Sequence, residues 1–109
     1  MTKTGQVVVA RGLAEMTKGT RVTVNSVLPG PTRSEAIVGF LQSKASNPNA
    51  SAEEVEKEYI QRERPTSLLQ RMAEDTEVAN LVTYLASPLA SNTNGAALRC
   101  EGGILRALF

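Results

Sequence analysis

The sequence predicts an α/β fold in which two parallel strands carry helices on both faces. Residues 22–28 form a short, nearly continuous apolar run that is typical of a strand buried on both sides. Residues 96–101 form a second short strand, which ends at a pair of glycines. A long and mainly helical connection lies between them, and strands joined in this way pair in parallel through a right-handed crossover.

The chain opens with a predicted helix over residues 3–18. Val9, Leu13 and Met16 recur at helical spacing, and Gly19 is a natural C-terminal stop. No capping residue precedes this segment. We therefore expect the sequence to start inside a structural element.

The predicted strand over 22–28 stops at Pro29-Gly30-Pro31, because proline lacks a ladder donor and glycine permits a sharp turn. Thr32 and Glu35 have the spacing of a capping box, so a helix is expected to follow, to about Ser43. In an open α/β sheet, ligands bind beyond the carboxyl end of a strand and face free helix amides. This turn is therefore the predicted ligand-binding loop.

A flexible break over residues 44–50 separates this helix from the next one. Ser51 and Glu54 form a second capping box, which opens a charged helix that runs to about Arg64. Its large apolar residues are few: Val55, Tyr59 and Ile60. We expect a surface flap that is poorly rooted in a core.

The clearest amphipathic pattern lies in a predicted helix from about residue 75 to residue 86, with Asp75 as a candidate N-cap. Its apolar residues repeat at i, i+3, i+4 and i+7: Val78, Leu81, Val82 and Leu85. In the strand that follows, Cys100 is expected to be a small buried hydrophobic residue. The apolar tail over residues 104–109 is expected to dock on another surface, because an exposed run of this kind favours aggregation.

Composition excludes several classes of function. A net charge of +1 creates no field for nucleic acid or for a membrane surface, and no apolar stretch approaches membrane length. The chain has no histidine, which excludes Ser-His and Cys-His nucleophiles and every histidine-bearing metal site. A single cysteine rules out an internal disulfide and suits a reducing compartment. We expect a cytoplasmic protein without a metal site, a nucleic-acid partner or a membrane segment.

Three segments, in this order and spacing, resemble the C-terminal portion of the short-chain dehydrogenases/reductases, which are NAD(P)-dependent oxidoreductases built on a Rossmann-like sheet. They are VTVNSVLPGPTRSE at 22–35, EVANLVTYLASPLAS at 77–91 and TNGAALRCEGG at 93–103. The third segment has Cys100 and Glu101 where the family usually has valine and aspartate. The resemblance covers essentially the whole chain and implies a single incomplete domain over residues 1–109, an incomplete Rossmann-like fragment.

The resemblance implies both a catalytic and a cofactor-binding role for Lys3. Lys3 takes the place of the lysine in the family's Y-x-x-x-K signature, which bonds the nicotinamide ribose. Its charge also lowers the pKa of the tyrosine that serves as general acid/base. That tyrosine would fall two positions before Met1, and neither Tyr59 nor Tyr84 replaces it. The alternative interpretation, that Lys3 is a solvated lysine near a frayed terminus without a functional role, stays open.

The resemblance also implies cofactor contacts in the predicted loop. Pro29 and Gly30 match the family's Pro-Gly pair beside the nicotinamide. Thr32 stands where a backbone group holds the carboxamide, and Ser34 stands where a threonine reaches a phosphate oxygen. Helix capping explains Thr32 and Ser34 equally well. Residues 35–64 match the family's variable substrate lid.

Two functions follow for the chain. One is a truncated oxidoreductase of a family that uses NAD or NADP on a carbonyl or hydroxyl group of a small molecule. This chain would be inactive alone, because the proton donor and the pyrophosphate-binding turn would lie upstream. The other is a non-catalytic, self-associating interaction module or pseudoenzyme. In either case we expect a homo-oligomer, since one edge of the strand at 22–28 lacks a neighbour. Gly5 and Gly12 would open a helix face to close approach.

Overall fold

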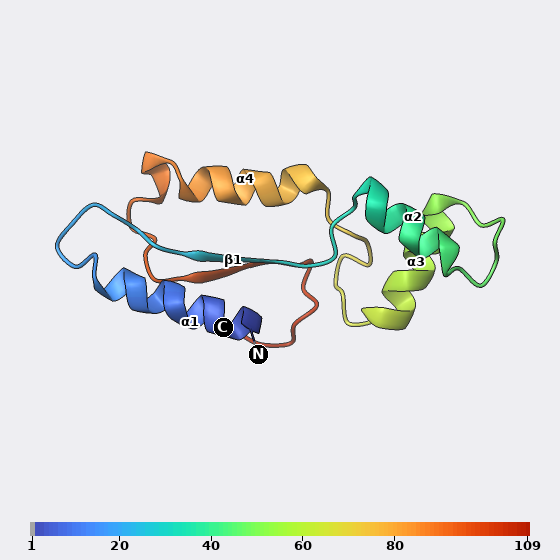
Figure 1. Ribbon diagram of the computed structural model, residues 1–109, viewed down its shortest axis with the longest axis horizontal. Coiled ribbons are helices and arrows are strands. Elements are labelled where there is room, and N and C mark those ends of the chain that lie inside the picture. The colour runs from blue at the N-terminus through green and yellow to red at the C-terminus, as the bar shows by residue number, and fades with distance from the viewer. Residues whose placement is uncertain (1) are drawn as a thin grey trace. The chain divides into compact units, whose positions relative to one another are not determined.

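The computed structural model describes residues 2–109, which form two compact units (Figure 1). The first unit contains the described residues up to Leu28 together with Val78–Cys100, and the second contains Pro29–Glu77 together with Glu101–Phe109. The elements follow in this order: α1 (Thr2–Glu15), β1 (Ser26–Pro29), α2 (Glu35–Ser43), α3 (Ala52–Glu63), α4 (Asp75–Leu85), the short 3-10 helix η1 (Pro88–Ala90) and β2 (Ala97–Cys100).

The first unit contains the sheet. β1 and β2 are parallel neighbours, and α1 and α4 lie on opposite faces of the pair (Figure 1). The Ser26 amide donates to the Ala96 carbonyl oxygen at 2.8 Å where the strands begin to pair. This arrangement confirms the predicted α/β class with two parallel strands and helices on both faces.

β1 is displaced from the predicted strand and starts only at Ser26. Before this residue, asparagine side chains take over bonds that backbone groups make in a regular ladder. The Asn94 Oδ1 atom accepts from the Val24 amide at 2.8 Å, and the Asn25 Nδ2 atom donates to the Thr93 carbonyl oxygen at 2.9 Å. Side-chain bonds of this kind compete with regular pairing and so delay the start of the strand.

Helix α1 ends at Glu15, earlier than predicted, and its apolar stripe is not covered by the described chain. Met16, just past the helix, is 80% exposed, and the apolar residues before it are exposed as well: Val8, Val9 and Leu13. Only Ala14 is buried on this helix. The helical spacing of the stripe is confirmed, whereas no residue described in the first unit shields it.

Helix α4 is confirmed, but its start differs in detail. Asp75 is the first helical residue rather than the residue before the helix. The preceding Glu74 amide is satisfied by the Glu77 carboxylate at 2.8 Å, which is half of a capping box. No helix among residues 2–109 combines the length and the apolarity that crossing a bilayer requires.

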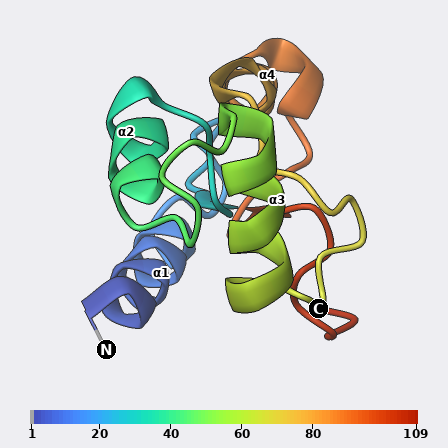
Figure 2. The ribbon, with the colours of Figure 1, turned by 90° about the vertical axis from the view of Figure 1, so that its right-hand side faces the viewer.

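The second unit holds the buried hydrophobic cluster of the described chain. Helices α2 and α3 lie side by side (Figure 2). Between and beside them are the buried side chains of the cluster: Leu41, Ala50, Val55, Ile60 and Met72. Ile60 and Met72 are each 1% exposed, and Tyr59 packs against the cluster from its edge.

The prediction of a flap that is poorly rooted in a core is therefore wrong. Helix α3 has few large apolar residues, but Val55 and Ile60 are both buried against partners from other segments. The predicted capping box at its start is confirmed, because Ser51 Oγ accepts from the Glu54 amide at 3.2 Å and Glu54 accepts from the Ser51 amide at 2.9 Å.

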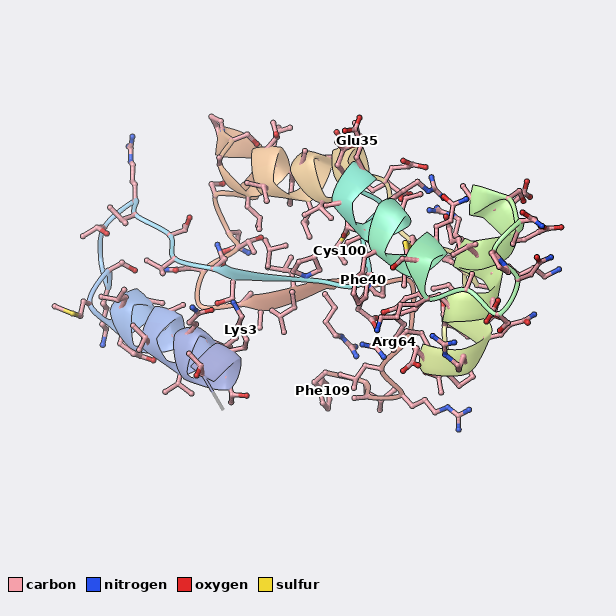
Figure 3. The ribbon with its side chains drawn as sticks, turned by 45° about the vertical axis from the view of Figure 1, so that its right-hand side comes forward. Lys3, Glu35, Phe40, Arg64, Cys100 and Phe109 are labelled. Carbon is pink, nitrogen blue, oxygen red and sulfur yellow. The ribbon has the colours of Figure 1, made fainter. Side chains whose placement is uncertain are left out.

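The C-terminal tail is anchored at its beginning. Thr66 Oγ1 donates to the Ile104 carbonyl oxygen at 2.7 Å. Leu108 and Phe109 are almost fully exposed, and Figure 3 labels Phe109 at the end of the tail. No surface within the described chain covers these two side chains, so the expected docking is not seen here. Cys100, expected to be buried, is half-buried at the end of β2.

If the cluster between α2 and α3 stabilises the second unit, Ile60→Ala should lower the free energy of unfolding by about 2–5 kcal/mol, because it opens a cavity. Urea denaturation followed by circular dichroism measures this loss. Ile37→Ala on α2 is the matched control, since Ile37 is 39% exposed and its truncation leaves no enclosed cavity. Equal losses in the two variants would contradict the assignment of the core.

Candidate functional site

The candidate loop begins where β1 ends, at Pro29 and Gly30. A Cβ atom placed on Gly30 would lie 2.8 Å from both Cα and Cβ of Glu101. Contacts this short with backbone atoms cannot be relieved by turning a side chain, so only glycine permits the two segments to approach each other. Gly30 therefore has a structural reason within this chain.

Glu101, the residue that faces Gly30, is itself held in place. Its carboxylate accepts from the Gly103 amide at 3.1 Å and from the Leu105 amide at 2.9 Å. Gly102 and Gly103 have φ values of +70° and +78°, which is a backbone conformation that favours glycine. The turn over residues 101–103 thus has a fixed conformation where it packs against the candidate loop.

A second segment fixes the loop from another side. The Arg33 amide donates to the Ala73 carbonyl oxygen at 2.8 Å, and the Ala73 amide donates to the Pro31 carbonyl oxygen at 2.9 Å. These two bonds form an isolated parallel bridge between Thr32 and Ala73. The loop is therefore fixed by its backbone, which is how a site holds a ligand in a set geometry.

The expected capping box between Thr32 and Glu35 is wrong. Thr32 Oγ1 donates to the Gly30 carbonyl oxygen at 3.0 Å, whereas Ser34 is the N-cap of α2 and accepts from the Ile37 amide at 3.3 Å. The backbone bridge to residue 73 keeps Thr32 extended, so Ser34 and not Thr32 caps the helix that begins at Glu35. The capping interpretation holds for Ser34 and not for Thr32.

The predicted site residues fall into two groups. Pro29, Gly30, Thr32 and Ser34 share one loop in the second unit. Lys3 belongs to the first unit, where it lies exposed in the first turn of α1 (Figure 3). Sequence spacing could place the four loop residues together, because they are nearly contiguous.

Arg33 is a residue of this loop that the sequence did not single out. Its Nε and Nη2 atoms donate to the two carboxylate oxygens of Glu56 on α3, each at 2.9 Å. Its Nη1 atom pairs with the carboxylate of Glu74, just before α4. The Arg33 side chain is about one-third exposed, while that of Glu56 is only 15% exposed. The ion pair that joins the loop to α3 is therefore partly shielded from solvent.

A second arginine pair holds the segment that follows α3. Both ends of the Arg71 guanidinium donate to the Glu77 carboxylate, at 2.9 and 2.8 Å. This hydrogen bonding, with the charge of Arg71, lowers the pKa of Glu77 below its ordinary value and raises the pKa of Arg71. Arg71 Nη1 also donates to the Met72 carbonyl oxygen at 3.0 Å, which orders the backbone next to Ala73.

Two clefts border α2 in the second unit. One has a volume of about 550 Å³ and is lined by residues of α3 and of the segment after it, including Glu56, Lys57 and Arg71. The other has a volume of about 580 Å³ and is lined by residues that include Ser34 and Glu74. Among the described residues, no group of three or more acidic, cysteine or histidine side chains is placed to hold a metal ion.

The fold and the loop match a known class of proteins. The sequence profile described as Enoyl-(Acyl carrier protein) reductase matches residues 1–105. Two proteins of Bacillus subtilis (strain 168), named uncharacterized oxidoreductases YvrD and YvaG, are 50% and 45% identical over 108 residues, which is 99% of this chain. These matches define the class of the Rossmann-like oxidoreductases. Within this class, the chain belongs to the short-chain dehydrogenase/reductase family.

A solved structure shows the same fold. The structure of L-sorbose reductase from Gluconobacter frateurii, complexed with NADPH and L-sorbose, superposes with a TM-score of 0.85 at 20% identity. The match covers 98% of this chain and 40% of the reductase. The chain also spans 41% of the length of YvrD and of YvaG. It thus corresponds to a part of these longer proteins.

We expect Gly30→Ala to lower the free energy of unfolding by about 1–3 kcal/mol, because the new methyl group meets the Glu101 backbone. Gly39→Ala is the matched control. Gly39 lies inside α2 with nothing within 4 Å of an added Cβ, so this change should stabilise the chain by roughly 0.5–1 kcal/mol. Urea denaturation of both variants measures the change in the free energy of unfolding, which we expect to be a loss for Gly30→Ala and a gain for Gly39→Ala. A Gly30→Ala chain as stable as the parent would refute the close approach.

Proposed function

We propose that this chain is the C-terminal portion of an NAD(P)-dependent oxidoreductase that acts on a carbonyl or hydroxyl group of a small molecule. The observation that carries the proposal is the family match over residues 1–105, which includes the fixed loop after β1. Two relatives named oxidoreductases and a reductase structure that contains NADPH support it. A cytoplasmic location belongs to the same proposal and rests on the single cysteine.

The loop fits the nicotinamide end of such a cofactor. Ser34 Oγ accepts the Ile37 amide, so its own hydroxyl hydrogen is available to donate to a phosphate oxygen. The backbone around Gly30 and Thr32 is held by the bridge to Ala73 and would position the carboxamide. When bound, the cofactor would supply or accept the hydride.

In this proposal Lys3 binds the nicotinamide ribose, and its charge lowers the pKa of a tyrosine that exchanges a proton with the substrate. Neither tyrosine of the chain fits that role. Tyr59 packs against the core between α2 and α3, and Tyr84 is exposed on α4. Neither stands in Y-x-x-x-K spacing with Lys3. The 109 residues are therefore proposed to be inactive by themselves.

The DNA before the Met1 codon tests this proposal. We expect it to continue in frame with a tyrosine codon two positions upstream and a glycine-rich turn farther upstream. A chain extended over that region should oxidise NADPH or NADH with carbonyl substrates, and the 109 residues alone should not.

In the extended chain, Lys3→Gln should lower kcat/KM by at least about 100-fold, as expected for the loss of a positioned acid–base partner. Lys18→Gln is the matched control, an exposed lysine beyond the end of α1, and should leave turnover unchanged. An upstream region without these residues, or an active Lys3→Gln chain, would overturn the assignment.

A second candidate function is a self-associating interaction module. The observation that favours it is the exposed apolar stripe of α1, formed by Val8, Val9, Leu13 and Met16. Gly5 and Gly12 have nothing within 4 Å of an added Cβ and leave room beside this stripe. An uncovered apolar surface of this kind favours association between protein chains.

Sedimentation velocity tests self-association. We expect the chain to form a homo-oligomer and Val9→Lys to shift it towards the monomer by at least about tenfold in dissociation constant, because a buried ammonium disfavours the contact. Leu89→Lys, which changes another exposed apolar residue of the first unit, is the control and should leave the distribution unchanged. A stable, folded monomer of the parent chain at high concentration would rule out this function.

A further inference from the structure

Arg33 lies between the two loop residues that are candidates for polar cofactor contacts, Thr32 and Ser34. Its amide is tied to the Ala73 carbonyl oxygen at 2.8 Å, so the backbone from which its side chain extends is fixed. A force on the Arg33 side chain is therefore transmitted to the backbone of the loop. This link between side chain and loop requires no bound molecule.

The partner of Arg33 is fixed as firmly. The Glu56 carboxylate accepts both nitrogens of the Arg33 fork at 2.9 Å and, in addition, the Met72 amide at 2.9 Å. Planar two-point contacts between arginine and carboxylate set direction as well as distance. Glu56 thus fastens α3 both to the loop and to the segment that forms the bridge with the loop.

The pairs that Arg62 makes in the second unit do not have this property. Arg62 on α3 contacts Glu58 at 3.5 Å and Glu63 at 2.9 Å, and both carboxylates lie on α3 itself. Exposed pairs within one helix contribute little and join no separate elements. Arg33 differs because its contacts span the loop, α3 and the residue before α4.

Arg33 also borders both clefts beside α2. Together with Val38, it lines the cleft of about 550 Å³ on the side of α3 and the cleft of about 580 Å³ on the side of Glu74. A displacement of α3 that breaks the contact with Glu56 therefore changes the walls of both clefts. The position of this one side chain depends on the position of α3.

We propose that Arg33 is a positioning residue that locks the helix pair α2–α3 to the loop over residues 29–34, so that the two move as one body. The interpretation of the loop as a cofactor site and of α2–α3 as a substrate lid rests on the proposed function. The mechanical coupling rests only on the contacts within the second unit. In the enzyme, cofactor at the loop would hold the lid in one position over the substrate.

Amide hydrogen exchange of the 109-residue chain tests the coupling. Arg33→Gln should speed the exchange of α3 amides by at least about tenfold, because a charge-assisted fork is lost. Arg33→Lys, which keeps the charge and loses the fork, should recover only part of the protection. Arg62→Gln is the matched control, and its α3 exchange should stay within about twofold of the parent, as expected for an exposed pair.

The decisive variant is Glu56→Gln, which changes α3 and leaves the loop sequence intact. We expect it to speed exchange of the Arg33 and Ala73 amides in the bridge by several-fold, and the double variant Arg33→Gln/Glu56→Gln to go no further than either single one. Circular dichroism checks that the helices persist. Bridge amides unaffected by Glu56→Gln, or α3 amides that respond equally to Arg33→Gln and Arg62→Gln, would overturn the proposal.

These exchange measurements do not depend on catalysis. An extended chain that fails to oxidise NADPH or NADH would refute the proposed function and leave the coupling intact. Conversely, an active extended chain whose bridge amides ignore Glu56→Gln would refute the coupling alone.

Discussion

The short parallel bridge between Thr32 and Ala73 is the constraint on which the second unit depends. It holds the loop after β1 in an extended form up to the N-cap Ser34, and α2 begins at Glu35. It also brings the segment after α3 against the loop, with Met72 buried in the core beside it. The loop owes its shape to this distant backbone partner and to the close approach of Gly30 and Glu101.

The features that the sequence predicted well depend on local interactions. The helix over 35–43 and the capping box of Ser51 and Glu54 are encoded within a few consecutive residues, and the structure reproduces them. The parallel pairing of the two strands followed from the long helical connection between them. The four loop residues of the candidate site lie on one loop because they are nearly contiguous in sequence, and their role in binding stays a prediction.

The features that the sequence did not predict depend on partners far along the chain. Asn25 and Asn94 shift the start of β1, although each looks like an ordinary turn or strand residue in isolation. The core of the α2–α3 pair includes Leu41 and Met72, which lie outside α3, so counting the apolar residues of α3 alone underestimated its burial. The fork of Arg33 joins residues of two elements, and helical spacing holds no information about such a pair.

The apolar core and the ionic fork have different roles in the second unit. Burial of Ile60 and its neighbours stabilises α3 against α2, but hydrophobic contact is not directional and tolerates small rotations of a helix. The fork between Arg33 and Glu56 is directional, and it specifies which part of α3 faces the loop. Lining residues of the clefts can therefore change without loss of the helix position, provided that these two side chains remain.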